Sequence, residues 1–228
     1  MVTVTIAVIQ FGGSNCDRDS VQALEAMGFD AELVWHEDGL PADTTGIMLP
    51  GGFSYGDYLR AGAMAARSPI MAEVREAAAD GTPVLGVCNG AQIGCESSLT
   101  PGAFTTNESA RFQCEHVYLR VENAETPWTS QYEEGEVVEL PIAHGEGRYE
   151  IPDDRLEELE ADGRVLFKYC DEDGEVKPGG GAHLWGFTRR MRDTTRRTNR
   201  QLFHSGLHQW VFTEPPGLKH TARCFDER

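Results

Sequence analysis

Short apolar runs alternate with amphipathic segments along the first half of the chain. The runs predict β-strands at residues 3–11, 31–36, 46–50 and 83–87. Between them, residues 17–28 and 69–81 carry apolar side chains at helical spacing, and each segment ends at a glycine. Strands separated by helices indicate a parallel sheet with right-handed crossovers. We therefore predict an α/β fold with a mostly parallel central sheet flanked by helices.

The pattern changes over residues 111–170. Residues 112–123 and 136–150 predict longer strands that face solvent on one side, which is typical of antiparallel pairing. A charged helix over residues 153–163 and a strand over residues 164–170 follow. We therefore expect an antiparallel strand region added to the parallel sheet.

A cysteine stands where the fourth predicted strand meets the next helix, in the stretch VLGVCNGAQIG of residues 84–94. Gly86 and Gly90 flank Cys88, as in a nucleophile elbow, where a sharp strand-to-helix turn holds one side chain above the sheet. The N-terminus of the next helix lowers the pKa of a thiol placed there, and the N–H of Asn89 faces a developing oxyanion. The alternative is a buried cysteine that packs as a small apolar residue.

Two further glycine-rich loops follow predicted strands, GGSNCDRD at residues 12–19 and PGGFSYGDYLRAG at residues 50–62. In open α/β sheets, ligands bind beyond the carboxyl ends of the strands, so these loops and Cys88 are expected to meet there. Gly51 and Gly52 come directly after a strand, and their N–H groups are predicted to complete an oxyanion hole. A simple turn is the alternative for this glycine pair.

Composition narrows the class of protein. The 228 residues suffice for one sizeable α/β domain. Residues 1–17 have no basic leading segment, and no long apolar run occurs, so neither a signal peptide nor a membrane span is expected. The six cysteines are scattered without a C-x-x-C pair, which favours reduced thiols in the cytoplasm over a disulfide framework. No metal-ligand spacing stands out, so no metal site is predicted.

The net charge of −17 is unevenly distributed. Residues 1–176 hold 10 Lys and Arg against 33 Asp and Glu, whereas residues 177–228 hold 10 against 4. An acidic surface with three lysines in the whole chain predicts a halophilic protein, and full stability in dilute buffer would contradict that prediction. The acidic body also argues against nucleic acid as a partner, although the tail contains the basic run TTRRTNR.

Six stretches together resemble one family, and they occur in that family's order between about Val4 and Cys170. They are GGSNCDRD, PGGFSYGDYLRAGA, VLGVCNGAQI, PGAFTTN, FQCEHVYLRVEN and PIAHGEGRYE. The family is that of the glutaminase subunits of phosphoribosylformylglycinamidine synthase, class I glutamine amidotransferases of de novo purine synthesis. The resemblance implies the flavodoxin-like fold of class I glutamine amidotransferases.

The resemblance also implies a mechanism. Cys88 attacks the carboxamide of glutamine to give a γ-glutamyl thioester and ammonia, and water then releases glutamate. Ammonia passes to a large synthetase subunit, which uses ATP and Mg²⁺ to convert formylglycinamide ribonucleotide to formylglycinamidine ribonucleotide, and a small third subunit completes the complex. This chain contains no P-loop, so no cofactor is expected on it. Phe53, Tyr55 and Gln92 are expected to contact the substrate.

The end of the chain departs from the family. The family places the base and its orienting acid in a late Pro-His-Pro-Glu motif, which residues 177–228 lack. We interpret these residues as an atypical basic tail, replaced or out of frame relative to the family, after an amidotransferase domain at residues 1–176. A divergent functional tail is the rival interpretation. His204 stands near the position expected for the base and His208 one helical turn later, but neither has an acid two residues on.

Two other function classes remain open. The first is a catalytically impaired interaction subunit, in which Cys88 can be alkylated but turnover fails. The second is a related hydrolase or stress protein with an elbow cysteine and no synthetase partner, and the GGFSYGDYLRAGA loop argues against it. His144 and Glu146 have His-x-Glu spacing, but the family separates this block from the triad, so a substrate-side or structural role is expected.

Overall fold

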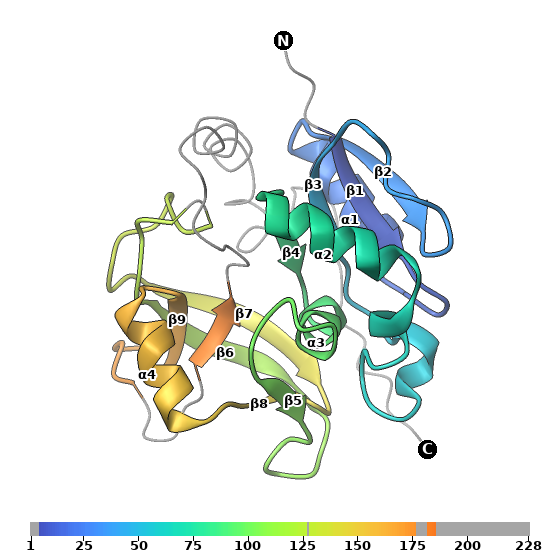
Figure 1. Cartoon of the computed structure of the whole chain (residues 1–228). Helices are drawn as coiled ribbons and strands as arrows, with labels where there is room; N and C mark the ends of the chain where they lie inside the picture. Colours follow the sequence, from blue (N-terminus) through green and yellow to red (C-terminus); the bar gives the residue numbers. More distant parts are fainter. Residues whose placement is uncertain (1–4, 127, 177–181, 186–228) are drawn as a thin grey trace.

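The described residues form two four-stranded sheets and one two-stranded sheet. The two larger sheets lie side by side, and the short helix α3 (Asn89–Glu96) lies between them (Figure 1). The computed structural model describes residues 5–126, 128–176 and 182–185. The predicted tail at residues 177–228 therefore lies outside the described residues, except for four residues of one strand. Within the described part of the chain, no helix has the length and apolar character needed to cross a membrane.

The first sheet is parallel throughout and has the strand order β2-β1-β3-β4. Its strands are β1 (Thr5–Gln10), β2 (Asp30–Trp35), β3 (Thr44–Leu49) and β4 (Val84–Gly86). The order matches the start of the flavodoxin-like arrangement. The parallel central sheet that the apolar runs predict is confirmed.

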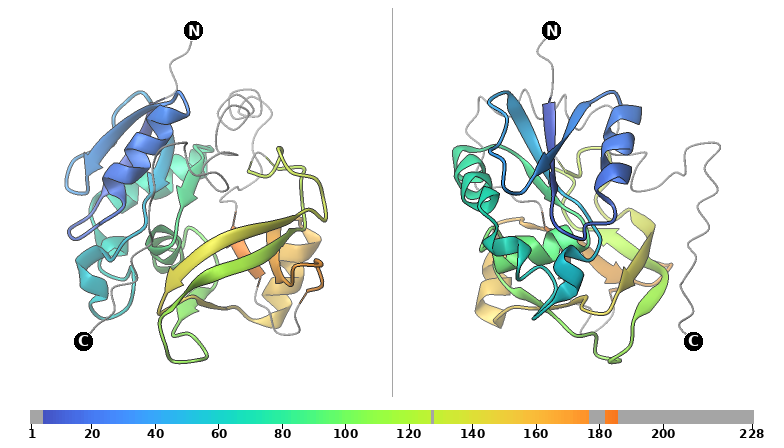
Figure 2. Two further views of the ribbon diagram at one scale, coloured as in Figure 1. Left: turned by 180° about the vertical axis from the view of Figure 1, so that it is seen from behind. Right: turned by 90° about the vertical axis from the view of Figure 1, so that its right-hand side faces the viewer.

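Helices cover both faces of this sheet, α1 (Asp17–Ala26) on one side and α2 (Ile70–Asp80) on the other (Figures 1 and 2). Alternate residues of a strand point to opposite faces, and β1 shows this directly. Ile6 and Val8 pack in one apolar cluster with Leu24 of α1. Ile9 packs in the other cluster with Ile70 of α2. Because both faces are buried, the strand is apolar from Ile6 to Ile9.

The second sheet is antiparallel and has the order β10-β9-β6-β7. Its strands are β6 (Gln113–Val121), β7 (Val137–His144), β9 (Val165–Cys170) and β10 (Ala182–Trp185). The added antiparallel region is thus confirmed. The charged helix α4 (Asp153–Ala161) buries Leu159, which is 1% exposed, against Val165 and Tyr149.

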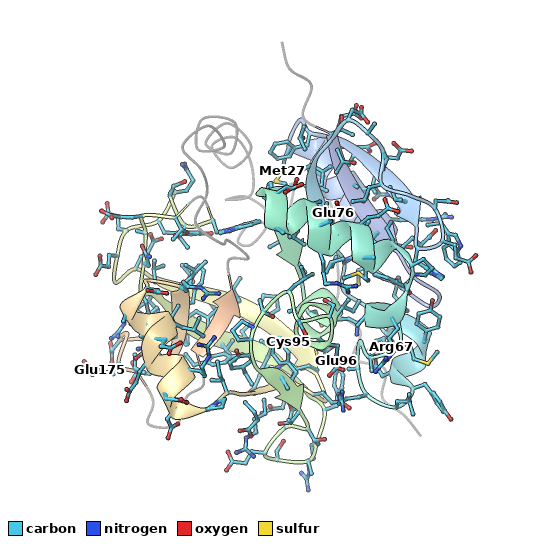
Figure 3. All side chains as sticks on the ribbon, in the orientation of Figure 1. Met27, Arg67, Glu76, Cys95, Glu96 and Glu175 are labelled. Atoms are coloured by element: carbon cyan, nitrogen blue, oxygen red, sulfur yellow. The ribbon has the colours of Figure 1, made fainter. Side chains whose placement is uncertain are left out.

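One prediction in this region is wrong. Residues 136–150 form two strands, because a turn at residues 145–147 separates β7 from β8 (Arg148–Glu150). Strand β8 leaves the second sheet and pairs antiparallel with β5 (Ala103–Thr105). This pair packs against Cys95 near the end of α3 (Asn89–Glu96), which Figure 3 labels. Strands of three residues carry too little pattern to be recognised from sequence alone.

Candidate active site

The stretch around Cys88 forms a strand–turn–helix elbow, as predicted. Strand β4 ends at Gly86, and α3 begins at Asn89, directly after the cysteine. The backbone of Cys88 has φ 50° and ψ −110°, a conformation that is strained for a residue with a side chain. Strain of this kind costs about 1–3 kcal/mol and persists only where the surroundings impose it. Cys88 keeps solvent exposure as a residue, so a substrate can approach it, although protein atoms surround most of its sulfur.

Close packing explains the two glycines of the elbow. A Cβ on Gly90 would lie 1.9 Å from the carbonyl oxygen of Leu49, at the end of β3. A Cβ on Gly86 would lie 2.8 Å from the carbonyl carbon of Gly90. The first turn of α3 therefore rests directly on the neighbouring strand. This contact places Cys88 beside the loop that follows β3.

That loop supplies the second half of an oxyanion hole. The backbone N–H groups of Asn89 and Gly52 lie beside the Cys88 sulfur, where they favour its ionised form and lower the pKa of the thiol. Gly52 has φ 127°, and a Cβ there would lie 2.6 Å from the backbone nitrogen of Asn15. The N–H of Gly52 can face the thiol because this residue has no side chain. Two donors that converge on the nucleophile are the arrangement that stabilises an oxyanion in acyl transfer.

The expected lowering of the Cys88 pKa is corrected by the structure. Burial by the surrounding protein raises the pKa of the thiol above its usual value, and the N–H groups of Asn89 and Gly52 only partly offset this. The N–H at the helix N-terminus thus lowers the pKa of the thiol, as predicted, but desolvation raises it by more. Since the thiolate is the nucleophile, Cys88 needs a proton acceptor at neutral pH.

The three predicted loops do meet at the carboxyl ends of their strands. The N–H of Cys16 donates to the carbonyl of Gly51 at 3.4 Å, and the N–H of Tyr55 donates to that of Gly12 at 2.6 Å. Gly51 is buried, and the space a side chain there would fill lies 3.5 Å from Cys88 Cβ and 3.7 Å from Cys16 Sγ. Gly51 therefore holds the first loop against the elbow.

The three residues predicted to contact substrate have different surroundings. Phe53 is 48% exposed at the start of the loop and is free to meet a ligand. The hydroxyl of Tyr55 is hydrogen-bonded to His36 Nε2 at 3.0 Å, and its partly buried ring packs against the core, so a substrate contact by Tyr55 stays a prediction. Gln92 is 8% exposed, and both ends of its amide are already hydrogen-bonded.

Sequence reasoning gave Glu146 no specific role and overlooked Asp57. A carboxylate oxygen of Glu146 accepts the N–H of Ala61 at 3.1 Å, and its carbonyl accepts from Gln92 Nε2 at 2.8 Å. Burial, and then the charge of Glu146, raise the pKa of Asp57. The HGEG stretch marked Glu146 as a candidate functional residue. Its contact with the loop could not be predicted, because Ala61 and Glu146 are 85 positions apart in the sequence.

The histidines do not supply a triad within the described residues. His144 Nδ1 is 2.9 Å from Asn107 Oδ1, and burial lowers the pKa of the ring. Its neighbour Ala143 presents a carbonyl 3.9 Å from Cys88 Sγ, so the end of β7 borders the thiol. His204, the predicted candidate base, lies outside the described residues. No group of three or more metal-ligating side chains gathers in the described part of the chain.

Comparisons with known proteins identify the family and the fold. Residues 3–179 match the family described as the CobB/CobQ-like glutamine amidotransferase domain. The phosphoribosylformylglycinamidine synthase subunits PurQ of Natronomonas pharaonis and Halobacterium salinarum are 73% and 72% identical over 173 residues, which cover 76% of this chain and 77% of each relative. The solved structure of PurLQS from Thermotoga maritima has a TM-score of 0.70 and 37% identity, and the match covers 91% of this chain and 99% of that one.

The fold and the elbow cysteine define a class I glutamine amidotransferase. Within that class, the chain belongs to the family of phosphoribosylformylglycinamidine synthase subunit PurQ. The family that six stretches of sequence indicate is thereby confirmed.

Substituting Gly52 tests the oxyanion hole. Gly52→Val places a Cβ against the backbone of Asn15 and displaces the N–H from Cys88. We expect thioester formation to slow by about a hundredfold or more, the usual effect of losing one such donor. Quenched-flow mass spectrometry of the Cys88 peptide measures this rate.

Gly135→Val is the matched control, because Gly135 also has a positive φ (84°) but has open space around it. It should lower stability without changing the acylation rate. An unchanged rate in Gly52→Val would remove this loop from the mechanism.

Proposed function

We propose that this chain is the glutaminase subunit of a phosphoribosylformylglycinamidine synthase. It hydrolyses glutamine to glutamate and ammonia through a thioester on Cys88. The ammonia serves a synthetase subunit that converts formylglycinamide ribonucleotide to formylglycinamidine ribonucleotide in purine biosynthesis. The observation that carries this proposal is the convergence of two N–H donors on Cys88, in a chain 73% identical to a PurQ subunit.

The site chemistry divides amide hydrolysis into two steps. The Cys88 sulfur, after loss of its proton, attacks the side-chain carbonyl carbon of glutamine, and the N–H groups of Gly52 and Asn89 hold the oxyanion. The tetrahedral intermediate then collapses and its C–N bond breaks. The nitrogen takes up a proton and departs as ammonia, and a γ-glutamyl thioester remains on Cys88. Water then cleaves the thioester, which returns the thiol and releases glutamate.

The partners follow from the same proposal. The solved relative is a PurLQS complex, which supports a synthetase subunit and a small third subunit as partners of this chain. ATP and Mg²⁺ belong on the synthetase subunit, and this chain carries no cofactor of its own. Cys16, Cys88 and Cys95 are free thiols, which is consistent with a cytoplasmic location. High identity to the Natronomonas and Halobacterium proteins supports the halophilic character that the acidic composition predicts.

Replacing Cys88 tests whether glutamine is hydrolysed on this chain while the ammonia is used on the synthetase subunit. In the assembled complex, Cys88→Ala should abolish synthesis from glutamine but spare synthesis from added ammonium, because ammonia is used on another protein. Formation of the formylglycinamidine product is measured with each nitrogen source. Loss of both activities with normal assembly would refute the proposal.

A second candidate function, a catalytically impaired interaction subunit, rests on three observations. The tail lacks the Pro-His-Pro-Glu motif, and burial raises the pKa of the Cys88 thiol. The family match also ends at residue 179, close to the start of the basic tail. A chain with a protonated thiol and no positioned base would bind its partners yet turn over glutamine very slowly.

Exchanging the tail decides between the two candidates. Positioned acid–base groups contribute about 10²–10⁴-fold to proton transfer steps. Replacing residues 177–228 with a tail that carries the family motif should therefore raise glutamine turnover by about that factor. His204→Ala and His208→Ala in the present chain should change little. Full turnover by the present chain, abolished by His204→Ala, would show that the tail supplies a genuine base.

A further inference from the structure

The loop from Gly51 to Ala61 is strained along its length. Tyr55, Asp57 and Leu59 have φ values of 53°, 54° and 73°, which side-chain-bearing residues seldom adopt. Such conformations persist only where neighbouring groups hold them. This loop begins with the oxyanion donor Gly52, so whatever holds the loop also sets the geometry at Cys88.

Two side chains from different parts of the fold anchor this loop. Near its start, the N–H of Ser54 donates to Asn89 Oδ1 at 3.2 Å. At its far end, the N–H of Ala61 donates to Glu146 Oε2 at 3.1 Å. Asn89 belongs to α3, whereas Glu146 lies in the turn between β7 and β8. The loop is therefore held from both sides of the site.

The two anchors are connected to each other. Asn89 Nδ2 donates to Gln92 Oε1 at 2.9 Å, and Gln92 Nε2 donates to the carbonyl of Glu146 at 2.8 Å. The chain of contacts from Ser54 through Asn89, Gln92 and Glu146 to Ala61 closes a ring beneath the loop. Asn89 and Gln92 are 1% and 8% exposed, so water does not compete freely for these hydrogen bonds.

The turn that carries Glu146 is itself fixed. Asn107, which is 5% exposed, accepts the N–H of Gly147 through Oδ1 at 2.9 Å. Its Nδ2 donates to the carbonyl of His144 at 2.8 Å. The carboxylate of Glu146 thus projects from a turn that is held at both ends. A fixed, negatively charged acceptor makes a stronger hydrogen bond to a backbone N–H than a neutral one does.

A second link acts at this end of the loop. Arg60 pairs with Glu96 at the end of α3, which Figure 3 labels, through two hydrogen bonds of 2.7 and 2.6 Å. The two parallel hydrogen bonds form a bidentate pair, although the Arg60 side chain is 57% exposed and solvent screens it. This pair fixes a side chain of the loop, whereas the carboxylate of Glu146 holds the loop backbone itself through the N–H of Ala61.

We propose that Glu146 is a positioning residue for the glutaminase reaction, its carboxylate acting through the N–H of Ala61 to hold the Gly52 donor opposite Cys88. This inference rests on the proposed function. It differs from a role in binding glutamine directly, which would raise the half-saturating concentration of a glutamine analogue instead of lowering the limiting rate. Loss of Glu146 should slow the chemical step and leave the affinity for a glutamine analogue nearly unchanged.

Inactivation by the diazoketone analogue of glutamine, diazo-oxo-norleucine, measures the two quantities separately. Adduct formation on Cys88 is followed by mass spectrometry, and its dependence on analogue concentration gives the limiting rate and the half-saturating concentration. Glu146→Ala should lower the limiting rate by about tenfold to a hundredfold, the expected effect of a displacement near one ångström. The half-saturating concentration should stay within about twofold.

Two further variants separate the hydrogen bond from the charge. Glu146→Gln keeps an oxygen that can accept from Ala61 N–H, so it should retain most of the wild-type rate. Glu146→Asp keeps the charge but is too short to reach Ala61, so it should be slow, and it decides the question even if Glu146→Ala fails to fold. Glu150→Ala, an exposed carboxylate on β8, is the matched control and should match the wild type.

Several outcomes would overturn the inference. One is a wild-type limiting rate in Glu146→Asp or Glu146→Ala. Another is a Glu146→Gln variant as slow as Glu146→Asp. The third is a Glu146→Ala variant with a raised half-saturating concentration and an unchanged limiting rate. The proposed function itself would be contradicted if iodoacetamide alkylated Cys88 of the wild-type chain but the glutamine analogue did not react with it.

Discussion

The contact between α3 and the end of β3 is the constraint on which the site depends. Gly90 approaches the carbonyl of Leu49 so closely that no side chain could be accommodated. This approach turns the chain sharply at Cys88 and sets the thiol beside the loop that starts at Gly51. The parallel sheet supplies the platform, since β3 and β4 are neighbours in it and end at the same edge.

The surroundings of Cys88 both stabilise and destabilise the ionised form of its thiol. Two backbone N–H groups favour the thiolate, but burial of the same atom raises its pKa, and Asp57 adds a negative charge nearby. An oxyanion placed between those N–H groups would receive both hydrogen bonds at once. The arrangement is therefore better suited to the charge that develops during attack than to the resting thiolate, and the proton of Cys88 must go elsewhere.

Sequence patterns captured the fold because its strands and helices carry strong local signals. The apolar runs of β1 and β3 and the G-x-C-x-G spacing around Cys88 are short-range features that packing did not override. The β5–β8 pair was not predicted because strands of three residues are too short to show a periodic pattern. The Glu146–Ala61 contact was not predicted because it joins segments that are distant in the sequence. The pKa of Cys88 was predicted in the wrong direction, since desolvation depends on tertiary packing and not on the motif. The hydrogen bond from Tyr55 to His36 was likewise not predicted, because it joins two different loops.

A crystal structure of the chain with a glutamine-derived ketone bound covalently to Cys88 would test the central claim most directly. The account predicts that the oxygen on the former carbonyl carbon lies about 2.7–3.1 Å from the backbone nitrogens of Gly52 and Asn89. The loop from Gly51 to Ala61 should keep its hydrogen bonds to Asn89 and Glu146. An adduct oxygen that points to solvent, or to any other pair of donors, would contradict the account.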